Sequence, residues 1–461
     1  MHACVLLMGK LTMNGSDTLK IPSASMSRGS TMVRTSFPNA EFWMAVVFLT
    51  MTIRGLTLWE LGEGQAHGRI GDMVLLGVFG LWFGGRCLSG RFGVVRNRLD
   101  LAVMMFVMFY VMSILWAYNV EAGWFRLLKL LRNWMLYILL ADYLSVNFLS
   151  RYRRIAVYIL LSGLFLSLAF VVSISRHGGT AALAMLLQAE DVPSSNPLLS
   201  VVRSDQGAGL MMMGFASWLP LCMFMGFSIQ PWIRSRVLAL GNLVYFYAMG
   251  AATLLSASRA AMVGLAGGLA IIFPLVAKTM TVKKIIGGGI ILLAVICGAW
   301  QFGLQNLVMA RFSYEVIEKD GAVSERLDFF EVAISRFKES PLVGKGVASI
   351  EPEAHLDTTG YWAVHNVYVQ VLAEIGIVGG ALFLWILVLW VWYLISAKRL
   401  ASHMRDPAIS RVAVALLAYS IFLFLFFLVG HDLGSGETWI IMGIASALYN
   451  GGARELSSGK N

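Results

Sequence analysis

Charged residues and cysteines are scarce in this chain. Asp, Glu, Lys and Arg make up 13% of its 461 residues, whereas 58% are apolar, and this balance excludes a water-soluble globular protein. The cysteines are Cys4, Cys87, Cys222 and Cys297; none falls in an expected outer loop, so no disulfide or zinc framework is implied. A Walker phosphate loop and a His-Glu-x-x-His pattern are also missing. We therefore expect no metal site and no cofactor.

Long apolar runs account for the composition. Apolar runs of about 18 residues or more are typical of membrane-spanning helices, and they are too long and continuous for the strands of a membrane barrel. By the criterion of about 18 apolar residues there are about twelve runs, the last of them shorter than the rest. They are 40–60, 70–88, 99–118, 127–147, 154–175, 207–229, 236–256, 258–277, 284–302, 366–396, 409–430 and 437–450. The sequence predicts an all-α polytopic membrane protein.

The basic residues fall in alternate loops between these runs. The net charge of +10 would suit nucleic acid, but its distribution follows the positive-inside rule, so we expect no nucleic-acid partner. The basic loops contain Arg86, Arg91, Arg96 and Arg98; Arg151, Arg153 and Arg154; Arg234 and Arg236; Lys278, Lys283 and Lys284; and Lys398, Arg399, Arg405 and Arg411. These loops and both termini are predicted to be cytoplasmic, and the polar segment after 301 is predicted to face outward.

Hydropathy divides the chain into five parts and shows no inverted repeat of the transporter type. They are a disordered cytoplasmic N-terminus (1–38), transmembrane helices 1–9 (39–301), a large periplasmic loop (302–365), transmembrane helices 10–12 (366–450) and a cytoplasmic tail (451–461). Met13, Met26 and Met32 are alternative starts.

The large loop is predicted to contain an amphipathic helix. Leu327, Phe330, Ile334 and Phe337 recur on one helix face, and Pro341 ends the pattern. Such a helix is expected at the membrane interface, either as a cap on the bundle or as a moving lid.

Two arginines on the predicted outer side are candidate anion ligands. Arg259 lies between two apolar runs with almost no loop, where a charge is costly unless an anion pairs with it. Its planar fork suits phosphate oxygens, although snorkelling to lipid headgroups is the alternative. Arg203 precedes a span on the same side, with Asp205 close enough in sequence to neutralise it.

Arg126, Lys129 and Arg132 open a span that is predicted to enter the membrane from outside. Basic residues there run against the positive-inside bias, and their spacing places them on neighbouring parts of one helix surface. They fit a lipid-linked pyrophosphate or, equally well, anionic lipid headgroups.

His365 and Asn366 lie where the large loop meets the next span. A histidine can take a proton from a hydroxyl near neutral pH, although one at a helix start often has only a structural role. Asn366 could orient the ring or a sugar hydroxyl. Glu374, about half a turn out of phase with His365 on a helix, is expected to pair with a buried donor in the bundle.

The order of these motifs resembles the O-antigen ligase and polymerase superfamily of bacterial membrane glycosyltransferases. Ser258-Arg259 is followed by Arg326-Leu327-x-Phe-Phe, Pro341-Leu-Val-Gly-Lys-Gly346, His365-Asn366-x-Tyr368 and Leu372-Ala-Glu374-x-Gly376-Ile-x-Gly379. The resemblance covers about 200–396. It implies that Arg203 and Arg259 hold a pyrophosphate and that His365 activates an acceptor hydroxyl. Arg326 and Asn366, which belong to the quoted motifs, are further substrate-binding candidates.

The resemblance also implies a reaction. Members transfer a glycan from undecaprenyl pyrophosphate to an acceptor at the periplasmic side of the inner membrane, by a metal-independent, inverting mechanism. An O-antigen ligase with lipid A–core as acceptor is the preferred interpretation. A polysaccharide polymerase or a protein O-glycosyltransferase is the alternative within the superfamily, and a flippase or transporter of lipid-linked sugars is the alternative from another class.

Overall fold

The computed structural model describes residues 39–52, 57–61, 66–90, 95–176, 215–255, 258–277, 321–350, 366–403, 406–429, 433 and 435–452. Every element below belongs to the unit Asn39–Asn461. The predicted N-terminal segment, the 284–302 span, Arg203 and His365 lie outside the described residues.

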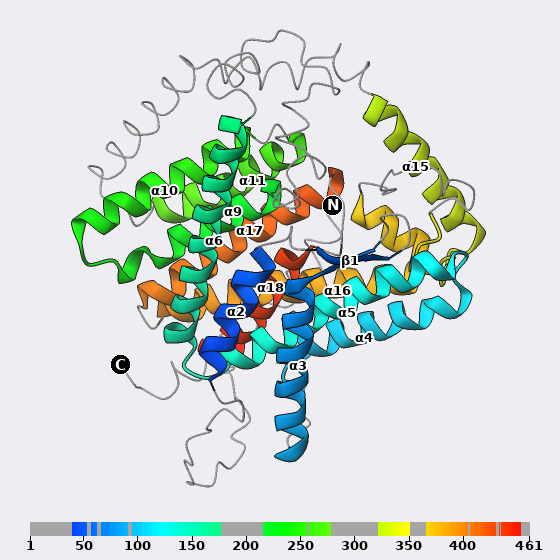
Figure 1. Ribbon diagram of the computed structural model, residues 1–461, viewed down its shortest axis with the longest axis horizontal. Helices are drawn as coiled ribbons and strands as arrows, with labels where there is room; N and C mark the ends of the chain where they lie inside the picture. Colours follow the sequence, from blue (N-terminus) through cyan, green and yellow to red (C-terminus); the bar gives the residue numbers. More distant parts are fainter. Residues whose placement is uncertain are drawn as a thin grey trace, which may run out of the picture. The chain divides into compact units, whose positions relative to one another are not determined.

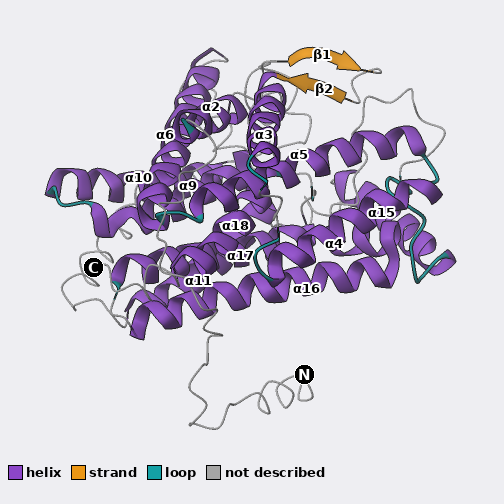
Figure 2. Ribbon diagram, turned by 90° about the horizontal axis from the view of Figure 1, so that it is seen from below, coloured by secondary structure: helices purple, strands orange, loops and turns teal. Residues whose placement is uncertain are grey.

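The structure confirms the all-α class (Figures 1 and 2). The helices are α2 (Ala40–Thr52), α3 (Ile70–Leu88), α4 (Arg98–Met112), α5 (Val120–Leu144), α6 (Phe148–Arg176), α9 (Phe215–Ile229), α10 (Arg236–Leu255), α11 (Arg259–Ala277), α15 (Gly321–Glu339), α16 (Val367–His403), α17 (Pro407–Val429) and α18 (Gly436–Ala447). Short turns of helix are η1 (Ser113–Trp116), η2 (Gln230–Trp232) and η3 (Leu448–Gly452).

One small sheet was not predicted. Thr57–Leu61 (β1) and Ala66–Arg69 (β2) pair as antiparallel strands between α2 and α3 (Figure 2). The predicted 40–60 span therefore ends as a helix at Thr52. Thr and Trp, which both occur in β1, favour strands, so an apolar run alone could not separate helix from strand here.

Within the described residues, five helices are long and apolar enough to cross a membrane. These are Ile70–Leu88, Arg98–Trp116, Arg236–Leu254, Val367–His403 and Pro407–Leu428, and Ala40–Thr50 and Arg259–Leu275 are shorter apolar helices. These helices indicate a multi-pass membrane protein, and the full count of about twelve spans stays a prediction.

The packing of α11 on α17 depends on glycine. A Cβ atom on Gly264 would lie 2.7 Å from the Phe422 ring, and one on Gly268 would lie 2.9 Å from the Ala418 carbonyl oxygen. Small residues allow such close approach of helices in membranes. Gly264 meets Phe422, whereas Gly268, later on α11, meets Ala418, earlier on α17. The two helices therefore run antiparallel.

The bundle has two ends that can be told apart by their contacts. The Tyr368 hydroxyl near the start of α16 donates to the Phe424 carbonyl near the end of α17 over 3.1 Å. The start of α11, which bears Arg259, lies at the same end because α11 and α17 are antiparallel. We call this the Glu374 end. At the opposite end the Arg98 amide donates to the Tyr393 hydroxyl over 3.1 Å, and we call it the Asp142 end.

Candidate functional site

Helix α16 is broken at Gly376, and a turn from the large loop fills the break. Gly376 has φ 63° and ψ −164°, so Ile377 and Val378 no longer donate to carbonyls one turn earlier on the helix. Their amides donate instead to Pro341 and Leu342, over 2.8 and 3.1 Å. Residues 341–346, which we call the docking turn, therefore restore part of the backbone hydrogen bonding that the break removes.

The docking turn also satisfies the carbonyls that the break leaves on α16. The Lys345 amide donates to the Ala373 carbonyl over 3.0 Å, and the Gly346 amide donates to the Glu374 carbonyl over 2.9 Å. In an unbroken helix these carbonyls would accept from Ile377 and Val378. Backbone hydrogen bonds donated in both directions thus join the docking turn to the segment of α16 around Gly376. From the sequence alone, these two motifs were known only to follow one another along the chain.

Positive φ angles and close contacts require glycine at Gly344, Gly346 and Gly376, whose φ angles are 69°, 88° and 63°. A Cβ atom on Gly376 would lie 2.4 Å from the Leu342 carbonyl carbon, and one on Gly346 would lie 2.4 Å from the Ala117 Cα. At Gly376, the absence of a side chain permits the break in α16.

Glu374 is the polar centre of this region. Its side chain is 0% exposed, and its carboxylate accepts from the Tyr110 hydroxyl of α4 and forms an ion pair with Arg126 of α5. The Gln370 side-chain amide and the Ala348 backbone amide each donate to Oε1 over 3.3 Å. The prediction that Glu374 pairs with a buried donor is confirmed, and a buried carboxylate needs such partners.

Ser113 links the chain after the docking turn to the end of α4. The Val347 amide donates to the Ser113 hydroxyl over 3.2 Å, and that hydroxyl donates to the Tyr110 carbonyl over 2.7 Å. Tyr110 and Ser113 were not singled out by sequence reasoning. The available signal was Glu374 itself, because a glutamate within an apolar run needs polar partners, and these must come from other helices.

The predicted amphipathic helix is present as α15. Phe329 and Ala333 are buried, and Ala333 packs with Ala373 of α16. The predicted face includes Leu327 and Phe330, which are exposed, so a neighbouring face makes the protein contact.

Two charged contacts tie the end of α15 to its surroundings. The Arg336 guanidinium lies 4.4 Å from the centre of the Tyr118 ring. Lys345 of the docking turn pairs with Glu339 over 2.9 Å, and this hydrogen bond lowers the pKa of the Glu339 carboxyl.

Two predicted site residues lie at helix starts. Ser258, beside Arg259, accepts from the Ala261 amide over 3.3 Å, and the Asn366 side-chain oxygen accepts from the Val369 amide over 3.1 Å. Both are N-cap contacts. The structure therefore gives Asn366 a helix-capping contact, and it brings Arg259 and Asn366 to the Glu374 end.

The predicted basic stripe on α5 faces carboxylates. Arg126 pairs with Glu374, and Arg132 pairs with Asp72 of α3 over 3.1 Å. Lys129 is partly buried. Arg326 falls within α15, and its side chain lies outside the described residues.

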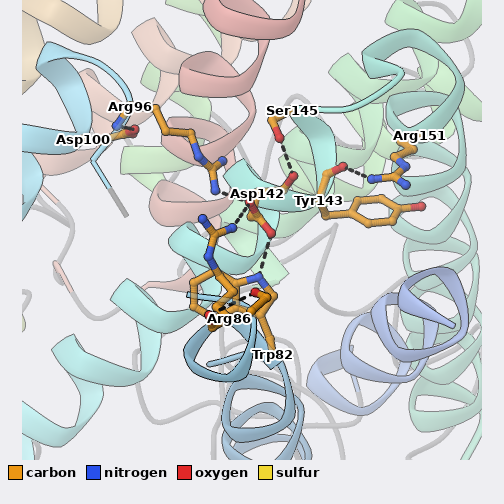
Figure 3. A network of polar contacts seen from close by, with 9 residues as sticks. Trp82, Arg86, Arg96, Asp100, Asp142, Tyr143, Ser145 and Arg151 are labelled. Atoms are coloured by element: carbon orange, nitrogen blue, oxygen red, sulfur yellow. Dashed lines mark hydrogen bonds and ion pairs between the residues drawn. The ribbon is translucent and has the colours of Figure 1, made fainter. Parts of the chain in front are cut away.

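A second polar network occupies the Asp142 end (Figure 3). The Asp142 carboxylate accepts from the Trp82 indole over 2.7 Å, from Arg86 over 2.8 Å and from Arg96. Arg151 donates to the Tyr143 carbonyl over 2.6 Å. Arg86, Arg96 and Arg151 come from two of the loops predicted to be cytoplasmic, and both loops lie at the end opposite Glu374.

Comparison with known proteins places a family match over the Glu374 end. Residues 244–384 match the family model described as O-Antigen ligase. The matched segment includes Arg259, the docking turn, Asn366 and Glu374. No curated protein matches the chain significantly. The family match supports the O-antigen ligase superfamily, as the order of motifs predicted.

Proposed function

We propose that this protein, whose residues 244–384 match the O-antigen ligase family, transfers an O-antigen glycan from undecaprenyl pyrophosphate to an acceptor hydroxyl. Lipid A–core is the proposed acceptor, and the periplasmic face of the bacterial inner membrane is the proposed location. The observation that carries the proposal is the match itself, because it covers Arg259, the docking turn, Asn366 and Glu374. A ligase- or polymerase-type function follows from the family in general.

The helix starts at the Glu374 end suit a pyrophosphate group. Helices α5, α11 and α16 all begin there, and helix N-termini carry partial positive charge. Arg259, at the start of α11, adds a guanidinium that can contact two phosphate oxygens at once. Arg203 is the second proposed pyrophosphate ligand, with Arg126, Lys129, Arg132 and Arg326 as further ligands of the donor.

The proposed reaction breaks the bond between the anomeric carbon and the pyrophosphate oxygen. His365 removes the proton of the acceptor hydroxyl as its oxygen attacks the anomeric carbon from the opposite face, which inverts the configuration. Undecaprenyl pyrophosphate leaves with the bonding electrons, and its charge is stabilised by arginines in a partly desolvated site. In this scheme the arginines stabilise the charge that a divalent cation would otherwise stabilise, so the proposed mechanism uses no metal ion.

Asn366 supports the acceptor side of this scheme. Its side-chain oxygen caps α16, which makes its side-chain NH2 the group that we propose for a sugar hydroxyl. The cap also fixes the start of α16 directly after His365.

The distribution of basic residues supports the proposed orientation. Arg86, Arg96 and Arg151 contact groups at the Asp142 end, and the positive-inside rule assigns such an end to the cytoplasm. The Glu374 end is then periplasmic, as is the proposed large loop with α15. The proposed topology keeps about twelve spans.

Deletion of the gene, followed by gel analysis of the lipopolysaccharide, tests the function. We expect core without O-antigen, together with accumulated lipid-linked polymer. Core with a single repeat unit would identify a polymerase. Unchanged lipopolysaccharide with loss of a capsule or a glycoprotein would overturn lipid A–core as the acceptor.

A further inference from the structure

Glu374 lies where four parts of the fold meet. Its carboxylate accepts hydrogen bonds from α4 (Tyr110), α5 (Arg126), the chain after the docking turn (Ala348) and α16 itself (Gln370). The glutamate side chain is 0% exposed, whereas that of Arg126 is 17% exposed. One partner of this ion pair is thus fully enclosed, and the other reaches the surface of the Glu374 end.

We propose that Glu374 is a positioning residue, which holds the Arg126 guanidinium in the orientation that binds the pyrophosphate of the lipid-linked donor. This inference rests on the proposed function and deepens it. It assigns Arg126 of α5 to the pyrophosphate and identifies the Glu374 carboxylate as the group that orients the Arg126 guanidinium.

Stability alone does not require this ion pair. Four backbone hydrogen bonds already hold the docking turn on α16 without any side chain. Replacing both members of a buried ion pair with uncharged groups often leaves stability unchanged, because the desolvation of two charges offsets their attraction. If Glu374 orients Arg126, the role needs a carboxylate on one side chain and a guanidinium on the other, which explains why both are charged.

The chemistry of arginine suits such a role. A guanidinium is a rigid planar fork with five N–H donors, so a carboxylate that binds one edge also fixes the direction of the rest. Glu374 is about 12 Å along α16 from Asn366, by the helix rise per residue. The oriented guanidinium and the proposed acceptor site therefore lie about two helical turns apart along α16.

A double-mutant cycle on binding tests the proposal. The variants are Glu374→Gln, Arg126→Met and the two combined, each purified in lipid nanodiscs. The probe is undecaprenyl pyrophosphate, with undecaprenol as a control for the lipid tail. Thermal unfolding is measured on the same samples, so that binding is compared at a temperature where every variant is folded.

We expect each single variant to bind undecaprenyl pyrophosphate about tenfold more weakly, the size of one charge-assisted hydrogen bond. The double variant should bind no more weakly than either single variant, since Glu374 acts through Arg126. Its thermal stability should recover toward wild type, because no uncompensated charge stays buried. Undecaprenol binding should be the same in all four proteins.

Asp142→Asn is the matched control, because Asp142 pairs with arginines at the other end of α5. It should lower thermal stability and leave binding unchanged. Wild-type affinity in Glu374→Gln, or losses that multiply to about a hundredfold in the double variant, would overturn the inference alone. If the wild-type protein binds undecaprenol and undecaprenyl pyrophosphate equally, the proposed function fails, and this inference fails with it.

Discussion

The backbone of Gly344 packs against the backbone of Glu374, so that a Cβ atom at position 344 would lie 2.3 Å from the Glu374 carbonyl carbon. The contact joins the docking turn to the helix that carries the buried carboxylate. Because both sides of this contact are backbone, neither can move aside as a flexible side chain would. The contact between the docking turn and α16 therefore depends on the absence of a side chain at position 344.

Gly344→Ala should destabilise the protein strongly. The left-handed conformation (φ 69°) costs about 1–2 kcal/mol for a residue with a Cβ, and the backbone clash adds to that cost. Thermal unfolding in detergent measures the effect. Gly80→Ala on α3 is the control, since a Cβ there would meet nothing within 4 Å. Equal melting temperatures for the two variants would contradict this account of the turn.

Tyr110→Phe should weaken the Glu374 network while keeping the ring contact with Phe106, whose centroid lies 5.9 Å away. Losing the donor to a buried carboxylate costs about 1–3 kcal/mol, which would appear as a lower unfolding midpoint. Tyr118→Phe is the matched control, because its ring keeps the contact with Arg336. Unchanged stability of Tyr110→Phe would show that its hydroxyl contributes little.

Sequence reasoning identified the helical membrane class and the ordered motifs, but not how the motifs meet. Pro341–Gly346 and Glu374–Gly376 are about 30 residues apart, and the bonds between them replace helical bonds that only a break in α16 removes. The sign of φ at Gly376 cannot be read from an apolar run. The capping role of Asn366 was also missed, although an Asn directly before an apolar run is a local N-cap signal.

The basic stripe on α5 shows a second limit. Its spacing predicted a shared surface, but the carboxylates that face Arg126 and Arg132 come from other helices, at Glu374 and Asp72. Tertiary pairing of this kind leaves no periodic signal in one sequence. The intramembrane charge of Glu374 was still informative, because such a charge needs a partner.

Arg259→Lys should reduce glycan transfer by about a hundredfold, the cost of removing one preorganised donor from a transition state. A lysine keeps the charge but cannot contact two phosphate oxygens in one plane. Transfer from a lipid-linked donor, measured with equal amounts of purified protein, checks this. Arg399→Lys at the far end of α16 should keep full activity, and wild-type turnover by Arg259→Lys would favour a headgroup contact instead.

Treatment with a metal chelator should leave the activity of the purified protein unchanged. The proposed site stabilises the leaving pyrophosphate with arginines and helix N-termini, so removing divalent ions takes nothing from the transition state. Transfer is measured with and without EDTA at constant ionic strength. Activity lost on chelation and restored by a divalent ion would disprove the metal-free mechanism.

His365→Ala should abolish transfer while leaving the protein in the membrane and able to bind undecaprenyl pyrophosphate. General-base catalysis contributes about 10²–10⁴-fold to rate, and the proposed base acts on the acceptor hydroxyl rather than on the donor. Transfer and donor binding are therefore measured side by side on the same preparation. His403→Ala, at the exposed end of α16, is the control and should behave as wild type. If His365→Ala lost donor binding to the same degree as transfer, the histidine would serve the donor site, and the acceptor proton would need another base.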